Sequence, residues 1–303
     1  MKIYYPMRPQ TILITGLAIF LLIFCSCQKE VNSIVNNAPL LDSVIYYNGF
    51  DDSVRLHFVY DGQDRVIEER ISYKDTLRTR RVYAYNGNDP WPYQMTGYSN
   101  GDLVNPESKS FYQYNSSGRK IYDSTWAMPG SVYTGYKVSH FDYSTPSRLF
   151  ISSSISPAYF QEKDTLVFNT TGNIDSMYGK ASYTPGVWTG DNVWKFSLYE
   201  TGENPLHNLS TAGARSFESI PGGSIYYFTG MSRLSLSDEV MDYFALNNFG
   251  SIVYQDRLHP SNSNTQQFQN FYDNNGQLVK QVIHSSYSNG TYNYTSAFRF
   301  VYR

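Results

Sequence analysis

The fold is set by the stretch Phe58-Val59-Tyr60-Asp61-Gly62-Gln63-Asp64-Arg65-Val66, variants of which recur along the chain. Each copy has an aromatic–x–aromatic triplet, then Asp or Asn, two or three turn-forming residues, and a new strand. Because side chains alternate along a strand, both rings of the triplet lie on one face of the sheet. The Asp or Asn can accept hydrogen bonds from the backbone two residues on, and a Gly at the fourth position after the second ring supplies a positive φ. Each copy therefore predicts a β-hairpin with a four- or five-residue turn.

The second aromatic residue of each copy, called the anchor here, recurs with a regular period. The anchors are Tyr60, Tyr85, Tyr114, Tyr143, Phe168, Tyr199 and Phe228, spaced 25, 29, 29, 25, 31 and 29 residues apart. Another clear copy has Tyr272 as its anchor, and the chain ends on a strand-like segment that finishes at Tyr302. A period in this range is typical of repeat architectures. We therefore predict an all-β domain, an antiparallel meander of tandem hairpins that forms an open curled sheet or a closed barrel.

The composition agrees with strands and turns. The chain has 29 Tyr and 18 Phe, and its 17% aromatic residues equal its 17% charged residues. Aromatic enrichment with scattered Gly, Asn, Asp and Ser favours strands joined by turns. The nearest approach to helical apolar spacing is over residues 237–246, which could form one short helix.

One copy carries a family resemblance. Tyr272-Asp273-Asn274-Asn275-Gly276 resembles the YD (RHS-like) repeat, although Gln277 stands where that repeat has Arg. Together with the N-terminal motif described next, the pattern resembles uncharacterised Bacteroidota lipoproteins built from degenerate repeats of this kind. True RHS shells have far more repeats, so the resemblance implies a β-sheet platform rather than an encapsulating cage.

The N-terminus predicts export and lipid attachment. Lys2 and Arg8 precede an almost wholly apolar run over residues 11–24, which fits a signal peptide and is short for a spanning helix of about 20 apolar residues. The run ends in Phe24-Cys25-Ser26-Cys27-Gln28, which resembles the looser lipobox of Bacteroidota lipoproteins. We expect a signal peptide over residues 1–26, lipidation at Cys27, a flexible tether over 27–40 and one β-repeat domain over 41–303. The alternative is an uncleaved anchor or an ordinary secretory signal.

The net charge and the cysteine content limit the partners and cross-links that we expect for this protein. Removing Lys2 and Arg8 with the leader leaves 22 basic side chains against 26 acidic ones, a net charge of −4. That balance argues against a nucleic-acid partner, which needs a basic face. Cys25 leaves with the leader and Cys27 is acylated, so no disulfide is expected. The predicted location is the outer membrane, by lipid anchor, and Gln28-Lys29-Glu30 leaves the cell surface and the periplasmic face equally open.

The sequence contains no recognisable catalytic or cofactor motif. The five His form no His-x-x-x-His pair, there is no Gly-x-Ser-x-Gly elbow, and no thiol remains for catalysis. Adjacent carboxylates such as Glu68 and Glu69 would point to opposite faces of a strand. We therefore expect a non-enzymatic protein without metal or cofactor.

Two groups of residues are candidate functional sites. Exposed aromatic rings can stack on sugars, and the first candidate ligand patch is Tyr183, Trp188, Trp194 and Tyr199; the alternative is cross-strand aromatic pairing. Asp-Ser/Thr followed by a methyl-bearing residue is similar to the O-glycosylation sequon of exported Bacteroidota proteins. The candidate acceptors are Ser43, Ser53, Thr76, Ser124, Thr165 and Ser176. The alternative is a turn that leads into a strand.

Two functional hypotheses follow. The first is an envelope module that binds a glycan or a protein, and the second is a periplasm-facing structural or assembly lipoprotein without a small ligand. Aromatic rings exposed on one continuous face would favour the first, and rings buried between hairpins would favour the second. A transmembrane barrel competes with both, but the segments are not cleanly apolar on one face and Arg303 departs from the usual aromatic ending.

Overall fold

The computed structural model describes residues 39–47, 53–98, 103–128, 135–156, 160–182, 184, 186–188, 192–207, 209, 247–248, 250–258, 260–288 and 293–303. The chain divides into two units, Met1–Pro39 and Leu40–Arg303. The signal peptide, Cys27, nearly all of the tether, the anchor Phe228 and the short helix predicted at 237–246 lie outside the described residues.

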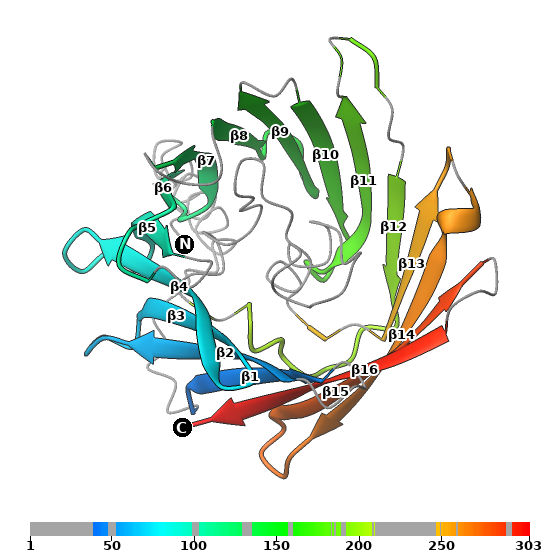
Figure 1. Ribbon diagram of the computed structural model, residues 1–303. Helices are drawn as coiled ribbons and strands as arrows, with labels where there is room; N and C mark the ends of the chain where they lie inside the picture. The colour runs from blue at the N-terminus through cyan, green and yellow to red at the C-terminus, as the bar shows by residue number, and fades with distance from the viewer. Residues whose placement is uncertain are drawn as a thin grey trace, which may run out of the picture. The chain divides into compact units, whose positions relative to one another are not determined.

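The second unit is a closed antiparallel barrel in which each strand pairs with the next along the chain and β1 pairs with β16. Its described strands are β1 (Leu41–Tyr47), β2 (Ser53–Tyr60), β3 (Val66–Tyr73), β4 (Thr76–Tyr85), β5 (Pro92–Tyr98), β6 (Ser108–Tyr114), β7 (Lys120–Ala127), β8 (Tyr136–Asp142), β9 (Arg148–Ser156), β10 (Phe160–Phe168), β11 (Ile174–Ser182), β12 (Asn192–Ser197), β13 (Ser251–Asp256), β14 (Asn264–Tyr272), β15 (Leu278–Tyr287) and β16 (Asn293–Tyr302). The blue β1 meets the red β16 where the ring closes (Figure 1). Closure leaves no unpaired sheet edge, so of the two predicted forms the closed barrel is confirmed.

The predicted turns are confirmed in detail. The side chains of Asp61, Asn115, Asn169 and Asp273 each accept hydrogen bonds, of 2.8–3.0 Å, from the backbone N–H groups two and four residues on. The fourth position after the anchor has a positive φ, and it is held by Gly118, Gly172 and Gly276 but also by Asp64 and Ser147. We call the end of the barrel that carries these turns the repeat end, and the opposite end the distal end.

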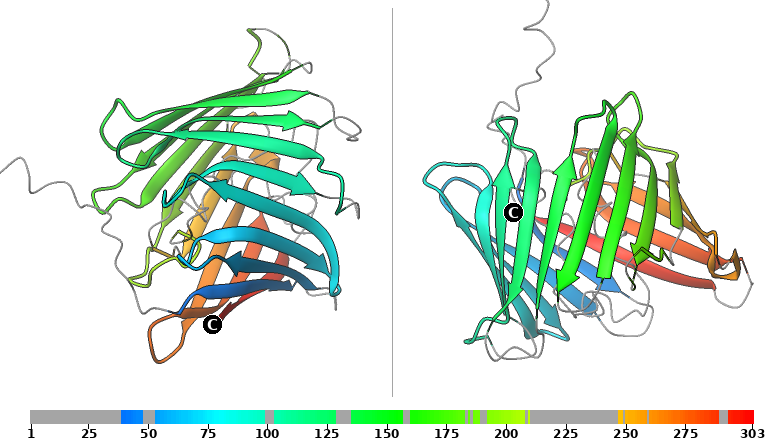
Figure 2. Two further views of the ribbon diagram at one scale, coloured as in Figure 1. Left: turned by 90° about the vertical axis from the view of Figure 1, so that its left-hand side faces the viewer. Right: turned by 90° about the horizontal axis from the view of Figure 1, so that it is seen from above.

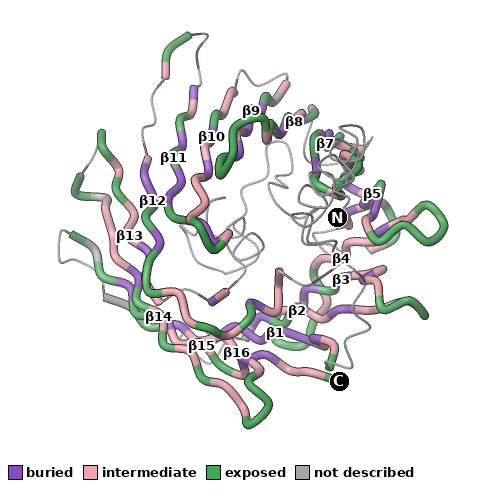
Figure 3. The backbone as a smooth tube through the Cα atoms, turned by 180° about the vertical axis from the view of Figure 1, so that it is seen from behind, coloured by how far each residue is buried: buried purple, intermediate pink, exposed green. Residues whose placement is uncertain are grey.

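The wall of the barrel has a buried inner face. Along β9, Leu149, Ile151 and Ser153 are buried while Ser152 and Ser154 are exposed. A similar alternation marks β6 and β8. Figure 3 shows buried and exposed segments along the wall, and Figure 2 shows the strands running between the two ends. Two apolar clusters form this inner face, one mainly on β1–β6, β15 and β16 and the other on β8–β13. In the described copies the two rings of a triplet share this face, so the prediction that they lie on one face is confirmed.

A set of tyrosine hydrogen bonds, called the tyrosine ladder here, ties neighbouring hairpins together at the repeat end. Among the described residues, five tyrosine hydroxyls at the ends of even-numbered strands each donate to the backbone carbonyl of the residue that begins the preceding odd-numbered strand, where no turn joins the two strands. The bonds are Tyr60 to Leu41 (2.6 Å), Tyr85 to Val66 (2.7 Å), Tyr114 to Pro92 (3.0 Å), Tyr199 to Ile174, and Tyr302 to Leu278 (2.9 Å). The anchor therefore fixes the stagger between hairpins.

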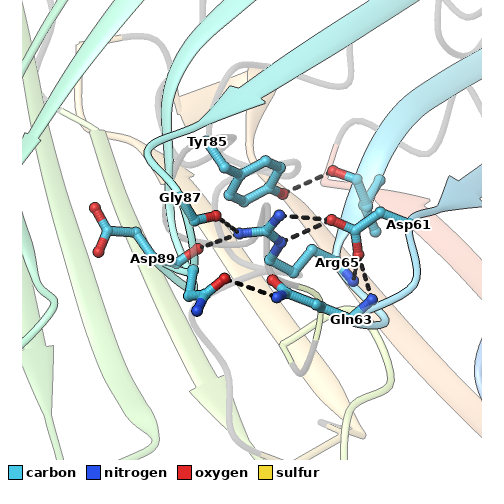
Figure 4. A network of polar contacts seen from close by, with 8 residues as sticks. Asp61, Gln63, Arg65, Tyr85, Gly87 and Asp89 are labelled. Carbon is cyan, nitrogen blue, oxygen red and sulfur yellow. Dashed lines mark hydrogen bonds and ion pairs between the residues drawn. The ribbon is translucent and has the colours of Figure 1, made fainter.

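An arginine after the turn adds a second lateral tie. The Arg65 side chain is held by Asp61 (Nε to Oδ2, 2.8 Å) and donates to the carbonyl oxygens of Gly87 and Asp89 in the next turn (2.8 and 2.9 Å). Its guanidinium lies 4.4 Å from the centre of the Tyr85 ring, as Figure 4 shows. Arg119 lies in the same way over Tyr143, at 5.3 Å.

The two ends of the second unit complete the pattern. The Arg303 N–H donates to the Leu40 carbonyl (2.9 Å), in the place of the bond between Asp61 N–H and the Arg65 carbonyl that closes the first turn (3.0 Å). The Arg303 guanidinium lies 4.5 Å from the centre of the Tyr60 ring. The last strand therefore pairs with the first as the two strands of a hairpin do.

One hairpin departs from the others. The connection between β12 and β13 runs from residue 198 to 250, whereas the other connections at the repeat end have five or six residues. Within it, Leu206 and Leu209 pack against the first apolar cluster. Tyr272, the next anchor, donates to Glu200 Oε2 (2.7 Å) and accepts from Asn248 Nδ2 (3.1 Å), so residues of the long connection replace the usual carbonyl partner.

The tyrosine ladder makes the barrel sensitive to alkali. Burial raises the pKa of the ladder residues Tyr60, Tyr114 and Tyr302 above the ordinary value of 10.0. Burial also raises the pKa of the anchor Tyr143 to about 12. The unfolded chain loses these protons near pH 10 while the folded barrel keeps them, so stability is full below pH 10 and falls as the pH rises through the folded values.

Tyr114→Phe should lower the free energy of unfolding by about 1 kcal/mol at neutral pH, because the Pro92 carbonyl loses its donor. It should also flatten the loss of stability above pH 10. Urea unfolding followed by circular dichroism between pH 7 and 11 measures both effects. Tyr93→Phe, at an exposed ring, is the control. An unchanged alkaline slope in the Tyr114 variant would contradict the role of the ladder.

Candidate functional site

The outer face of the barrel wall is polar and charged. Outward-facing, exposed basic residues occur on β2, β3, β4, β10, β11, β12, β15 and β16. They are Arg55, Arg70, Arg78, Lys163, Lys180, Lys195, Lys280 and Arg299. Glu68 also faces outward and pairs with both Arg70 and Arg80 (2.9 Å each). A membrane-spanning barrel has the opposite arrangement, with an apolar outer band, and a Lys or Arg at mid-bilayer costs roughly 2–4 kcal/mol.

Part of the inner face, called the luminal polar wall here, is hydrophilic. Its hydroxyl residues are Ser108, Ser110, Thr125, Ser139 and Ser153, and its charged residues are Lys120, Asp123, Lys137 and Asp164, all buried. They lie on β6–β10 in adjacent register positions. Ser110 and Thr125 share a hydrogen bond of 2.8 Å, and Ser153 donates to Ser139 at 2.9 Å.

A buried ion pair is the most unusual element of the luminal polar wall. Lys120 Nζ lies 3.0 Å from Asp123 Oδ2, and the two residues are 3% and 2% exposed. The Lys120 ammonium also lies 4.6 Å from the centre of the Phe141 ring and 5.6 Å from that of Tyr112. Burial lowers the pKa of Lys120, and the charge of Asp123 opposes this shift. Burial, with the nearby Glu162, raises the pKa of Asp164.

Aromatic rings gather at one place on the outer face. Trp126 of β7 and Tyr136 of β8 are register partners, 47% and 37% exposed, and their ring centres are 4.8 Å apart at an interplanar angle of 21°. Phe111 of β6 is exposed nearby, and Tyr122 of β7 packs edge-on against His140 at 5.3 Å. We call Phe111, Tyr122, Trp126 and Tyr136 the outer aromatic strip.

The residues of the candidate ligand patch do not gather on one surface. Trp194 faces inward on β12, is buried, and packs against Tyr254 with ring centres 5.2 Å apart. Tyr199 belongs to the tyrosine ladder at the repeat end. Trp188 precedes β12 at the distal end, with Lys163 Nζ 5.0 Å from its ring centre. Tyr183 lies outside the described residues. The sequence did not distinguish the inward-facing Trp194 from the exposed Trp126.

The candidate O-glycosylation residues differ in exposure. Thr76 is exposed, at the start of β4 beside the tight turn between β3 and β4, whereas Thr165 is partly buried. Ser43, Ser124 and Ser176 are buried within strands, and the side chain of Ser53 is not described. Of the five acceptors whose side chains are described, Thr76 alone is exposed to solvent.

Other site classes find no support in the part of the chain that the structure describes. No group of three or more His, Cys, Asp or Glu is placed to hold a metal ion among the described residues. The described residues also include no helix long and apolar enough to cross a membrane.

Comparison with known proteins gives a fold likeness. No protein-family model matches the chain, and no curated protein matches it. A solved structure of a porin-like protein from Bacteroides vulgatus ATCC 8482 aligns with a TM-score of 0.54 and 16% identity, over 88% of this chain and 99% of that one. A porin-like protein from Bacteroides uniformis ATCC 8492 aligns with a TM-score of 0.50 and 11% identity, over 87% and 96%. At these identities, the likeness shows the fold alone.

Proposed function

We propose that this chain is a non-enzymatic cell-envelope protein whose barrel stands in water and is held at the outer membrane by a lipid on Cys27. The observation that carries this proposal is the distribution of polarity across the wall. Charged side chains point outward in the middle of strands, while Phe58, Leu149 and Leu166 point inward and are fully buried. An outer face of this kind is stable against water and unstable against lipid.

The likeness to porin-like proteins supports an envelope location, and the lipobox-like motif supplies the means of attachment. The barrel begins at Leu41, fourteen residues after Cys27. An extended chain of that length reaches roughly 50 Å. The tether leads into β1 at the repeat end.

The lipid anchor is tested by expressing Cys27→Ala behind a cleavable secretory leader. The wild type should fractionate with the outer membrane and need detergent for release, whereas the variant should be soluble and folded without detergent, because its wall needs no lipid. Cell fractionation and circular dichroism measure the two outcomes. A variant that stays in the outer membrane and requires detergent would show that the wall itself is embedded.

Protease treatment of intact and lysed cells then distinguishes the surface from the periplasmic face.

A second candidate function is glycan binding at the outer aromatic strip. Most rings of the chain are buried at the inner face, which agrees with a structural role, but Trp126 and Tyr136 are exposed side by side on a polar outer face. Lys109, the register partner of Trp126 on β6, supplies a hydrogen-bond donor beside them. Exposed rings flanked by polar groups suit the apolar face and the hydroxyl groups of a sugar. This continuous face favours the binding hypothesis over a purely structural one.

Trp126→Ala should weaken binding of a polysaccharide at least tenfold, a loss of about 1.4 kcal/mol. Its effect on stability should stay within the 0.2–1 kcal/mol typical of one cross-strand pair. Affinity electrophoresis in gels that contain starch, xylan or arabinogalactan measures the first effect. Tyr178→Ala, at an exposed ring on β11, is the matched control. Equal retardation of both variants, or none for the wild type, would count against this function.

A further inference from the structure

Comparison of the repeats with one another makes Lys120 an exception. The first inward-facing residue of each odd-numbered strand at the repeat end, which is the first or second residue of the strand, is apolar in the other described hairpins. These residues are Leu41, Val66, Pro92, Leu149, Ile174 and Leu278. The strand β13 begins after the long connection and has no equivalent. Lys120 occupies the same position on β7, three residues before Asp123. The position of Asp123, three residues further along the strand, is held by Met95 on β5, Met177 on β11 and Gln281 on β15. On β3 it is held by another acid, Glu69.

The fold does not require this charge. Moving an ammonium group and a carboxylate out of water costs several kcal/mol per ion, and a buried pair can often be replaced by apolar residues without loss of stability. The chain itself contains that replacement, since Ile174 and Met177 hold the same two positions on β11 and are fully buried. By the standard of the other hairpins, folding does not require the ion pair.

A hydroxyl group beside the ion pair points to a ligand. Tyr112 on β6 is the register partner of Asp123, faces inward and is 5% exposed, and within the described part of the chain its hydroxyl has no hydrogen-bond partner. Buried polar groups are nearly always paired, so an unpaired hydroxyl calls for a specific explanation. Tyr112 contrasts with Tyr114, two residues on, whose hydroxyl is used in the tyrosine ladder.

We propose that the luminal polar wall binds a small neutral carbohydrate at Lys120, Asp123 and Tyr112. The ammonium and the carboxylate supply charge-assisted hydrogen bonds to sugar hydroxyls, the Tyr112 hydroxyl adds a neutral one, and the rings of Tyr112 and Phe141 offer apolar surface. The cluster pairs its charges internally and so suits an uncharged ligand. Barrels of sixteen to eighteen strands generally leave a channel inside them. This inference goes beyond the proposed function and depends neither on the lipid nor on the outer aromatic strip.

Two conservative variants of the full barrel separate binding from folding. Tyr112→Phe removes a hydroxyl without a partner and should leave stability unchanged, but should weaken sugar binding at least tenfold. Tyr114→Phe removes a ladder hydroxyl and should lower stability without changing the affinity of the folded protein. Isothermal titration calorimetry with glucose, galactose, xylose and cellobiose measures the affinity, and urea unfolding measures stability. The proposal is overturned if none of the four sugars binds the wild type, or if both variants bind as the wild type does.

A third variant tests the ion pair. Lys120→Ile combined with Asp123→Met copies the pair found on β11, and it should keep or raise stability while abolishing sugar binding. Lys163→Met, at an exposed lysine on β10, is the control and should bind normally. A double variant that unfolds would show that the pair is structural, and one that binds sugar normally would exclude it from the site. Trp126→Ala should leave these affinities unchanged, so failure at the outer aromatic strip and failure here are distinguishable.

Discussion

The hydrogen bond from an anchor tyrosine to the backbone of the neighbouring hairpin is the interaction on which the rest of the barrel depends. Local turn chemistry can form each hairpin but cannot set how one hairpin meets the next. The bond from Tyr85 to the Val66 carbonyl fixes that stagger, and Arg65 reinforces it from the same end. Repetition of one stagger around the ring brings β16 back to β1 in register, where Tyr302 and Arg303 make the same contacts. The same side-chain bond thus recurs on both sides of the seam where the barrel closes.

A barrel fold does not by itself say which solvent surrounds it. The porin-like neighbours share the path of the chain, but fold and function are separable, and identities of 16% and 11% leave the chemistry of the wall to be read from this chain. Here the alternation of side chains places Lys195 outward between the buried Trp194 and Phe196. In a strand with that pattern, the charged groups of the outer face are suited to hydration by water. The same geometry can therefore serve an embedded pore or a tethered, water-surrounded protein, and the outward residues decide between them.

The hairpins could be predicted from the sequence because their signals are local. An Asp or Asn, a positive-φ position and an alternating aromatic triplet all act within about ten residues, and they place the turns after Tyr60, Tyr114 and Phe168 correctly. Closure depends on contacts between distant strands, so the sequence left it open. The candidate ligand patch depended on which way rings point, and this could not be known before the register of β12 was known. The exception at Lys120 was visible in the sequence, but it has meaning only once the repeat positions are aligned in three dimensions.

Near-symmetry makes exceptions informative. Several hairpins of this chain fold with the same residue types at equivalent positions. A residue of another type at one of those positions is therefore not needed to form a hairpin of this kind. Tyr272 departs because the long connection supplies Glu200 and Asn248 as new partners, which is a structural cause. For Lys120 and Asp123 no such cause lies in the described backbone, which keeps the same bulge after Tyr114 as after Tyr60 and Phe168. The backbone of the wall holds Lys120 and Asp123 in the same geometry as the apolar residues of other hairpins. Ligand binding therefore explains this buried ion pair better than a requirement of the fold does.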